Sequence, residues 1–470
     1  MGKFELLTGK LEYKGIEFIF VFNKRELRLI PPADKVQDVF SWFTKLVGNG
    51  AYITNNPVYI EENYLKGYCN ELNQRIIFFA KNCRIHRFNL GQSLKIDIET
   101  YSIQKYDGKE NEINRLDFYS DEINYIFPPV DALEYPEWSE KGNISVKVKE
   151  FEKTTSVPKD FFVDSKRVKI FFSIFRGTSK QIGHAPLELR SSMIFEFDNT
   201  TDYSFILLLI NIAKEFIQFL CYRKDIVFDN INMLSLCQDG KYMKVGTLYE
   251  NDDFIDKEEK IFSRCINYKC IQGYEGKILN DIAEKKLYLR HIPISYKSGC
   301  FIDSARFIII VTAFEWTFKQ LYKEGVPKKD KTIKAENEVE IEVGKLRDEA
   351  TGKKKDIYKF LYKLVRSTNL STKIIQVGKD YSKILNNFGN WLYSKNEETL
   401  NYKKTGERLA EQRNHFAHGA LDEEFIELSL LDLVFLEYII YALQLKNYNI
   451  EDKKIKDAIK NLFGVPIASD

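Results

Sequence analysis

The sequence predicts an α+β protein in which a β-rich N-terminal module is followed by an all-α helical bundle. Two observations predict this order. Up to about residue 200, apolar and polar residues tend to alternate, as in the stretch 16–22 (IEFIFVF), which is typical of half-buried strands. After about residue 295, apolar residues recur every three or four positions, as in 307–318, which is typical of helices. We therefore expect two domains, 1–290 and 296–470.

The expected elements follow in chain order. In the N-terminal module we expect strands at 16–22, 144–148, 168–175, 193–197, 225–236 and 241–249. The long apolar stretch 203–221 predicts a helix that packs across a sheet. In the C-terminal domain, Asp303 is a plausible N-cap for the first helix. Further helices are expected at about 338–367, 372–394, 404–418, 424–446 and 452–463.

Composition restricts the function classes. The chain of 470 residues carries a net charge of only +2, so a nucleic-acid partner would need a local basic patch. Seven scattered cysteines favour a reducing compartment, and we expect a cytoplasmic protein without a membrane segment. Cys265 and Cys270 form a close pair, but no second pair of zinc ligands follows. No glycine-rich phosphate loop precedes residue 290, and no cofactor or metal is expected.

The candidate catalytic residues lie in one short segment near the C-terminus. Only five histidines occur in the chain, yet His415 and His418 stand together beside Arg413 and Asn414. On a helix, Asn414 and His418 share a face, so the amide can orient the imidazole. Arg413 and His418 lie about 140° apart, so they converge only if the last helical turn loosens, which Gly419 would permit.

These residue types fit cleavage of RNA without a metal ion. That reaction needs a base near the ribose 2′-hydroxyl, an acid near the leaving 5′-oxygen, and positive charge against the phosphorane. Histidine exchanges a proton near neutral pH, and the planar guanidinium of arginine matches two phosphate oxygens. A purely structural alternative stays open: His418 and Gly419 end a helix whose dipole the imidazolium satisfies, while Arg413 is solvated.

The string Arg413-Asn414, three residues, His418 resembles the arginine-to-histidine signature of the HEPN nuclease superfamily. The segment 306–315 (RFIIIVTAFE) is similar to the first helix of ApeA-type HEPN domains, with its glutamate at Glu315. The β-rich region with its helix at 203–221 is also similar to the ApeA N-terminal module. The chain thus resembles ApeA-like anti-phage abortive-infection ribonucleases with an HEPN-type helical bundle.

The resemblance implies a role for each of these residues. Arg413 would stabilise the scissile phosphate, His418 would act as general base or acid, Asn414 would orient His418, and Glu315 would support the arginine. An alternative for Glu315 is an unrelated salt bridge on a core helix. The resemblance further implies a homodimer through the HEPN domain, a phage-derived trigger protein sensed by the N-terminal module, and products with a 2′,3′-cyclic phosphate and a 5′-hydroxyl.

A run of basic residues between 353 and 383 offers a candidate RNA contact. Its densest part consists of Lys353, Lys354, Lys355 and Lys359. Each phosphate contact would make RNA binding salt-dependent. A charged stretch on a helix is also consistent with an ordinary solvated face.

Three functions therefore remain open from the sequence. The first is a triggered endoribonuclease that cuts transfer RNA or other single-stranded loops. The second is a non-catalytic RNA-binding protein that keeps the helical bundle, and the third is a phage-sensing interaction protein in which another component kills the cell. They differ in what His418→Ala and Arg413→Ala would abolish.

Overall fold

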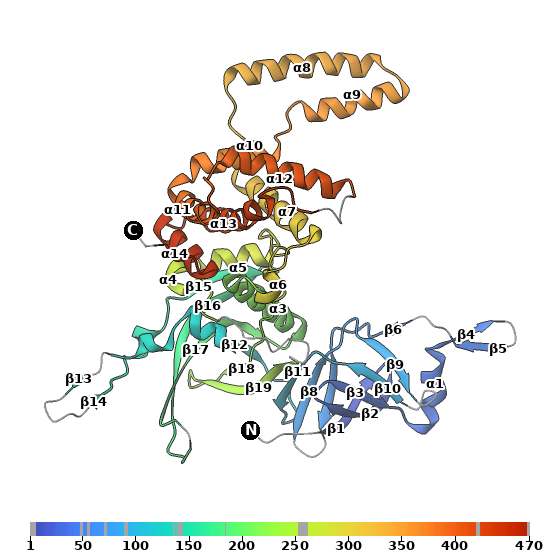
Figure 1. Cartoon of the computed structure of the whole chain (residues 1–470). Helices are drawn as coiled ribbons and strands as arrows, with labels where there is room; N and C mark the ends of the chain where they lie inside the picture. The colour runs from blue at the N-terminus through green and yellow to red at the C-terminus, as the bar shows by residue number, and fades with distance from the viewer. Residues whose placement is uncertain are drawn as a thin grey trace. The chain divides into compact units, whose positions relative to one another are not determined.

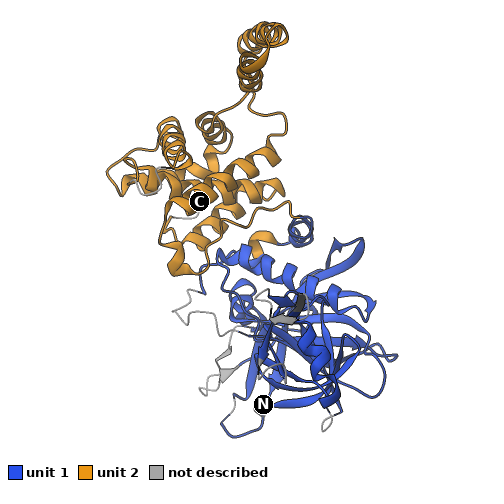
Figure 2. Cartoon of the chain, turned by 90° about the vertical axis from the view of Figure 1, so that its right-hand side faces the viewer, with its two compact units in different colours: residues 1–268, 272–284 blue, residues 269–271, 285–470 orange. Residues whose placement is uncertain are grey.

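The computed structural model of the chain describes residues 6–47, 50–53, 57–69, 73–88, 93–134, 137–138, 144–183, 185–251, 262–419 and 424–467. The chain forms two compact units (Figure 2). Unit 1 comprises residues 1–268 and 272–284, and unit 2 comprises residues 269–271 and 285–470.

The main feature of unit 1 is a sheet in which fifteen strands of the described chain are hydrogen-bonded in one order (Figure 1). Every neighbouring pair in this sheet is antiparallel. The order is β15-β16-β17-β12-β18-β19-β11-β8-β7-β1-β2-β3-β10-β9-β6. Its strands are β1 (Leu7–Tyr13), β2 (Ile16–Asn23), β3 (Glu26–Ile30), β6 (Val58–Tyr59), β7 (Leu65–Cys69), β8 (Gln74–Phe79), β9 (Arg84–Phe88), β10 (Ser93–Asp97), β11 (Thr100–Lys105), β12 (Ile113–Tyr119), β15 (Lys159–Val163), β16 (Lys166–Thr178), β17 (Leu187–Thr200), β18 (Asn230–Leu236) and β19 (Tyr242–Glu250).

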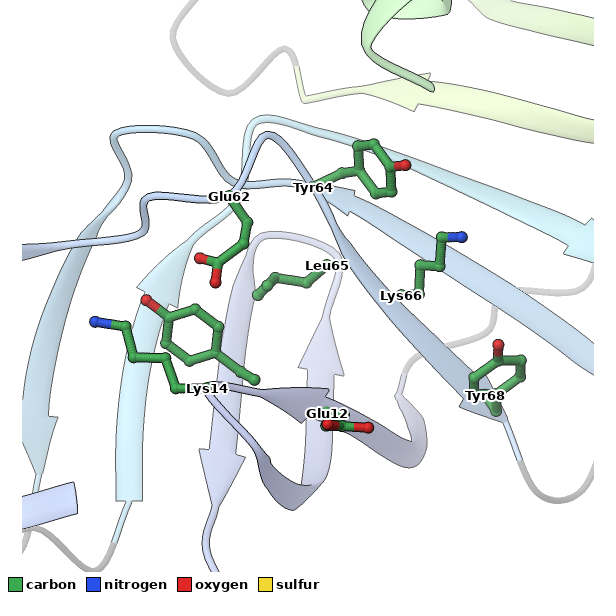
Figure 3. Close-up of a pocket in the computed structure, with 8 residues that line it drawn as sticks. Glu12, Lys14, Glu62, Tyr64, Leu65, Lys66 and Tyr68 are labelled. Carbon is green, nitrogen blue, oxygen red and sulfur yellow. The ribbon is translucent and has the colours of Figure 1, made fainter. Parts of the chain in front are cut away.

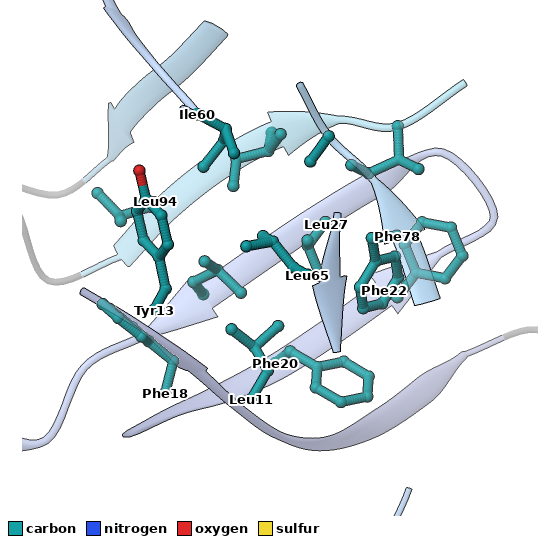
Figure 4. Packing of buried hydrophobic residues seen from close by; sticks show 14 of the residues in the cluster. Leu11, Tyr13, Phe18, Phe20, Phe22, Leu27, Ile60, Leu65, Phe78 and Leu94 are labelled. Atoms are coloured by element: carbon teal, nitrogen blue, oxygen red, sulfur yellow. The ribbon is translucent and has the colours of Figure 1, made fainter. Parts of the chain in front are cut away.

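The first strands show how the alternating pattern produces a core. In β1 and β2 buried and exposed residues alternate, because successive side chains of a strand point to opposite faces. The turn between them places Lys14 at φ 52° and Gly15 at φ 71°, the left-handed conformation that tight hairpins require. The inward side chains, including Phe20, Phe22 and Phe78, form an aromatic-rich core with the neighbouring strands (Figure 4).

One strand pair joins the early part of the sheet to the late part. Strand β11 lies between β8 and β19, with Thr100 opposite Phe79 on one side and Glu250 on the other. The early strands of the sheet therefore join the late strands only through β11, which pairs with a strand about 150 residues further along the chain.

The described chain contains four further short strands and several helices in unit 1. The strands β4 (Thr44–Val47) and β5 (Gly50–Ile53) pair with each other, as do β13 (Glu137–Trp138) and β14 (Ile144–Ser145). The helices are α1 (Val36–Ser41), α2 (Asp121–Ile126), α3 (Tyr203–Cys221) and α5 (Glu275–Ala283), with single 3₁₀ turns at η1 (Ala33–Lys35), η3 (Pro129–Ala132) and η4 (Glu152–Thr154). The short helix α4 (Tyr268–Ile271) follows the sheet.

Helix α3 is the long apolar helix that the sequence predicts. It begins at the N-cap Asp202, whose carboxylate accepts hydrogen bonds from the backbone N–H groups of Ser204 and Phe205. In the part of the chain that the structure describes, it is the one helix long and apolar enough to cross a bilayer by length and composition. Most of its residues are buried inside unit 1, which is the burial pattern of a core helix.

Unit 2 is helical throughout its described part. Its helices are α6 (Tyr296–Gly299), α7 (Ser304–Leu321), α8 (Asp330–Glu349), α9 (Gly352–Leu364), α10 (Leu370–Asp380), α11 (Ser382–Ser394), α12 (Tyr402–Ala417), α13 (Ser429–Asn447) and α14 (Asp452–Phe463). Helix α13 is buried along most of its length and forms the centre of the bundle. Helices α8 and α9 pack against each other as a hairpin, which projects from the other helices of unit 2 in both views (Figures 1 and 2).

The α+β class, with a β-rich region followed by helices, is confirmed. Two predictions of a single long helix were wrong, because the structure has two shorter helices in each place. The expected helix 338–367 is interrupted at Ala350 and Thr351, and Gly352 has φ 61°, so the chain reverses into the α8–α9 hairpin. The expected helix 372–394 is divided at Tyr381 into α10 and α11. The expected strand 144–148 is limited to two residues.

Two glycines allow α10 and α12 to approach closely. A Cβ atom on Gly406 of α12 would lie 2.6 Å from the Cα of Ser371, and one on Gly378 of α10 would lie 2.4 Å from the ring of Tyr402. Both distances are shorter than any ordinary carbon contact. The spacing of these helices therefore depends on the absence of two side chains.

We predict that Gly406→Ala destabilises the protein. The obstructing atom is backbone, so the helices must separate, and overpacking of this kind costs about 1–3 kcal/mol. The matched control is Gly344→Ala on α8, where the new Cβ meets only the Tyr362 ring, at 3.6 Å. There the better helix propensity of alanine should add up to about 1 kcal/mol. Urea unfolding of both variants measures the difference, and equal stabilities would contradict the close approach.

Candidate functional site

Helix α12, which carries the predicted catalytic segment, has one buried face. Thr405, Leu409, Gln412 and Phe416 are all buried, and their spacing of four, three and four residues places them on one side of a helix. The N-cap Asn401 begins the helix by accepting hydrogen bonds from the backbone N–H groups of residues 403 and 404. The burial of this face fixes the rotation of α12 about its own axis.

A buried polar network anchors the middle of α12 to α13 and α11. The fully buried carboxylate of Asp432 on α13 accepts two hydrogen bonds from Arg408, at 2.6 Å from Nε and 2.7 Å from Nη2. Tyr393 of α11 also donates its hydroxyl hydrogen to Asp432 and lies 2.9 Å from the Thr405 hydroxyl. Burial, followed by the charge of Asp432, raises the pKa of Tyr393, so its hydroxyl stays protonated as a donor.

Two contacts hold the C-terminal half of α12. The side-chain oxygen of Gln412 accepts hydrogen bonds from the backbone N–H of Ile426, at 2.6 Å, and from the hydroxyl of Ser429, at 3.1 Å. The ring of Phe416 packs edge-on against Phe307 of α7 and Phe425, with ring centres 5.4 and 5.6 Å apart. The end of α12 is therefore held directly before Arg413 and again between Asn414 and His418.

The structure brings Arg413 and Glu315 together. Arg413 Nη2 on α12 lies 3.1 Å from Glu315 Oε2 on α7, and the other oxygen of Glu315 accepts a hydrogen bond of 2.8 Å from Lys373 Nζ on α10. One carboxylate thus lies between two cations from different helices. Glu315 is 24% exposed and Arg413 is 43% exposed, so the pair is open to solvent on the arginine side.

Lys373 is a member of this cluster that the sequence did not identify individually. The sequence shows it only as one of nine basic residues between 353 and 383, and spacing gives no sign of a contact with α7. Its partner Glu315 lies 58 positions earlier in the chain. The one usable signal is that Lys373 is the neighbour of Ile374, which is buried, so its side chain leaves the helix near the core.

Asn414 and His418 lie on the exposed side at the end of α12. His418 is the C-cap, and its backbone N–H is shared between the carbonyls of Asn414, at 3.0 Å, and His415, at 3.2 Å. Gly419 follows with φ 95°. Within the described residues the side chains of Asn414 and His418 form no hydrogen bond with each other, so the expected orientation of the imidazole by the amide is not made in this structure.

This arrangement can bind an anion and exchange a proton. The guanidinium of Arg413 has five N–H donors, and the ion pair with Glu315 leaves donors directed to solvent. Two cations and one carboxylate leave the Glu315 cluster with one net positive charge. The exposed imidazole of His418, five residues after Arg413, is available to a ligand from solvent.

The four lysines proposed from sequence as RNA contacts lie together on α9. Lys353, Lys354 and Lys359 are exposed and Lys355 is half-buried. Lys359 pairs with Asp356 at 3.0 Å, and the ammonium of Lys354 lies 5.9 Å from the ring centre of Tyr358. They belong to the α8–α9 hairpin and not to the helices that carry Arg413 and Glu315.

Unit 1 contains a separate pocket of about 380 Å³ that includes none of the predicted site residues (Figure 3). It is lined by Glu12, Tyr13, Lys14, Glu62, Tyr64, Leu65, Lys66 and Tyr68. Burial, followed by the charges of Glu62 and Glu61, raises the pKa of Tyr13 above its ordinary value. Acidic and basic side chains both line the pocket, so its charge does not favour one class of ligand.

No group of three His, Cys, Asp or Glu side chains suited to a metal ion occurs in the part of the chain that the structure describes. Cys265 and Cys270 are both buried, and neither is joined in a disulfide. Burial raises the pKa of Cys270 to about 11, which keeps it a thiol near neutral pH.

Asp432 and Glu315 should respond very differently to loss of their charge. We predict that Asp432→Ala destabilises the protein by about 3–5 kcal/mol, because it leaves Arg408 without its partner in a largely buried position. Glu315→Gln should change stability by less than about 1 kcal/mol, since Arg413 is well exposed and solvent screens the pair. Denaturant unfolding measures both, and a large loss in Glu315→Gln would make Glu315 a structural residue.

Comparison of the chain with models of protein families, with curated proteins and with solved structures finds no match. A function for the site at the end of α12 therefore rests on the chemistry of its own residues. That chemistry is an exposed arginine held by a carboxylate, beside an exposed amide and imidazole.

Proposed function

We propose that this protein is a metal-independent endoribonuclease whose active site lies at the C-terminal end of α12. The observation that carries the proposal is the position of Arg413, held by Glu315 at 3.1 Å yet 43% exposed, on the same helix end as Asn414 and His418. An arginine needed only for stability would gain little from so exposed a pair. An arginine that binds phosphate needs both a fixed position and free donors.

Each residue has a distinct part in the proposed reaction. Arg413 binds the scissile phosphate and stabilises the charge that develops on it. His418 transfers a proton to or from the reacting oxygens, as general base or acid. Asn414 orients His418 once the substrate is bound, because hydrogen bonds of catalytic groups often tighten only in the complex. Glu315, with Lys373, is a positioning residue for Arg413.

The type of nuclease is proposed from the sequence pattern. The arginine-to-histidine spacing and the segment ending at Glu315 resemble ApeA-like HEPN proteins, and the ion pair between Glu315 and Arg413 supports that resemblance. On this proposal the protein is a cytoplasmic anti-phage effector that forms a homodimer through its helical domain. Unit 1 restrains the nuclease until a phage-derived protein binds, and transfer RNA or another single-stranded loop is cut. The α9 lysines contribute to RNA binding.

The proposal predicts RNA cleavage that EDTA does not inhibit and that two single substitutions abolish. Total RNA is incubated with the purified protein, and 5′-hydroxyl and 2′,3′-cyclic phosphate ends are mapped. His418→Ala removes a proton-transfer group, which is worth about 10²–10⁴-fold in rate. Arg413→Ala removes charge stabilisation of a similar size, about 10²–10³-fold. If the isolated protein is inactive because its trigger is absent, the native chain and both variants are expressed in cells during phage challenge, where the phage supplies the trigger.

Matched controls are available in unit 1. His86 is an exposed histidine on β9, and Arg167 is a 58% exposed arginine on β16 in an ion pair with Asp160. His86→Ala and Arg167→Ala should leave cleavage and phage defence unchanged. If RNA is retained but no new ends appear, the protein binds RNA without turnover. If defence survives both Arg413→Ala and His418→Ala, the proposed active site is wrong.

A conservative substitution separates charge from geometry. Arg413→Lys keeps the positive charge beside Glu315 but loses the planar fork that binds two phosphate oxygens. We predict that Arg413→Lys loses at least about tenfold in cleavage rate, while its unfolding midpoint stays that of the native protein. Full activity of Arg413→Lys would show that Arg413 acts only as a point charge. The rate is measured under single-turnover conditions on an end-labelled RNA.

A further inference from the structure

The α8–α9 hairpin has no buried residue on either helix. Eight large apolar side chains on it are exposed: Ile333, Val339, Ile341 and Leu346 on α8, and Ile357, Phe360, Leu361 and Leu364 on α9. Contiguous apolar surface of this kind marks a binding surface on a folded protein. The hairpin therefore presents more apolar surface than its own packing uses.

On α9 the apolar residues are directed away from the partner helix. Ile357, Phe360, Leu361 and Leu364 follow the spacing of one helical stripe, and Phe360 is 62% exposed. The side that faces α8 consists instead of half-buried residues, among them Lys355, Tyr358 and Tyr362. Arg347 of α8 lies over the Tyr362 ring, at 4.7 Å, and Arg366, just after α9, pairs with Glu340 of α8.

Helix α8 carries a second, shorter apolar row. Its half-buried residues Glu336, Glu340, Val343 and Arg347 recur at helical spacing and form the side against α9. Val339 and Leu346, seven residues apart, lie on another side and are both exposed. Each helix of the hairpin thus has one side for its neighbour and a separate exposed apolar row.

The charges on the two helices are complementary. Helix α8 carries seven acidic and four basic residues, a net charge of −3, whereas α9 carries five lysines and one aspartate, a net charge of +4. Some of these charges are used within the hairpin, as in Arg366 with Glu340. Among the described residues, Glu338 and Glu342 of α8 and Lys354 and Lys363 of α9 form no ion pair there. A surface with negative charge on one helix and positive charge on the other is complementary to a second copy of itself related by a two-fold axis.

We infer that the α8–α9 hairpin is a docking surface for a second copy of this chain, in which α9 of each copy packs on α8 of the other. The apolar stripe of α9 covers the Val339–Leu346 row, and the lysines of α9 lie beside Glu338 and Glu342. Two hairpins related by a two-fold axis form a four-helix arrangement with both contacts made twice. This contact is the one that holds together the homodimer proposed for the helical domain, and it does not depend on nuclease activity.

RNA is a weaker fit to the apolar stripe and to Lys354 and Lys363, which this contact uses, and the other lysines of α9 remain candidates for RNA contacts. Phosphates would pair with the lysines of α9, but the net charge of α8 would repel them and the apolar stripe would stay exposed. A second copy covers the stripe and pairs both signs of charge. A second copy of the chain is therefore the partner that accounts for both the exposed apolar stripe and the opposite charges of the two helices.

The first test is the mass of the full chain by sedimentation equilibrium over a range of concentrations. The native chain should be a dimer, and the double variant I357E/L361E should weaken dimerisation by about 100-fold or more, since buried apolar anchors dominate such interfaces. Both side chains are exposed, so the fold should be unaffected. The matched control is Ile182→Glu, a fully exposed apolar residue between β16 and β17, which should leave the mass unchanged.

Charge exchange then tests which helices meet. K354E/K363E on α9 and E338K/E342K on α8 should each weaken the dimer, and the chain with all four changes should recover it. A native chain that is monomeric, a dimer that survives I357E/L361E, or charge variants that fail to rescue one another would overturn the inference. If the hairpin variants lose RNA binding without any change in mass, the surface binds RNA instead.

Discussion

The geometry of unit 2 depends on one buried carboxylate. Asp432 is removed from water on α13, and a desolvated charge is tolerated only where donors surround it, as Arg408 and Tyr393 do here. Because Arg408 belongs to α12 and Tyr393 to α11, the same carboxylate fixes three helices against one another. The rotation of α12 is then set, and Arg413, one and a half turns later, is directed toward Glu315.

The sequence predicted the fold class and much of its detail where local physics is strong. Helices α3 and α14 match their predicted ranges because each has a long apolar stripe and definite ends. The N-cap at Asp303 was also predicted correctly, since a carboxylate before an apolar run satisfies free backbone N–H groups. The proximity of Glu315 to Arg413 was expected from a resemblance, and nothing in their spacing of 98 positions would have indicated it.

The rest could not be predicted because it depends on tertiary contacts. The hairpin between α8 and α9 turns at a single Thr-Gly step, and the helical periodicity on both sides is compatible with one continuous helix. The reversal is held by pairs such as Arg366 with Glu340, 26 positions apart. Lys373 was indistinguishable from its basic neighbours, and a buried Asp432 contradicts the usual preference of aspartate for the surface.

The pairing of β11 with β19 affects how the chain is made. A ribosome adds residues in order, and Thr100–Lys105 leaves the exit tunnel long before Tyr242–Glu250 exists. Until then β11 presents an open edge, and unpaired edges are where newly made chains associate wrongly. At roughly 5–20 residues per second the exposed interval lasts on the order of ten seconds. A chaperone that binds unpaired β-edges would have to bind during this interval of synthesis, before the helices of unit 2 have emerged.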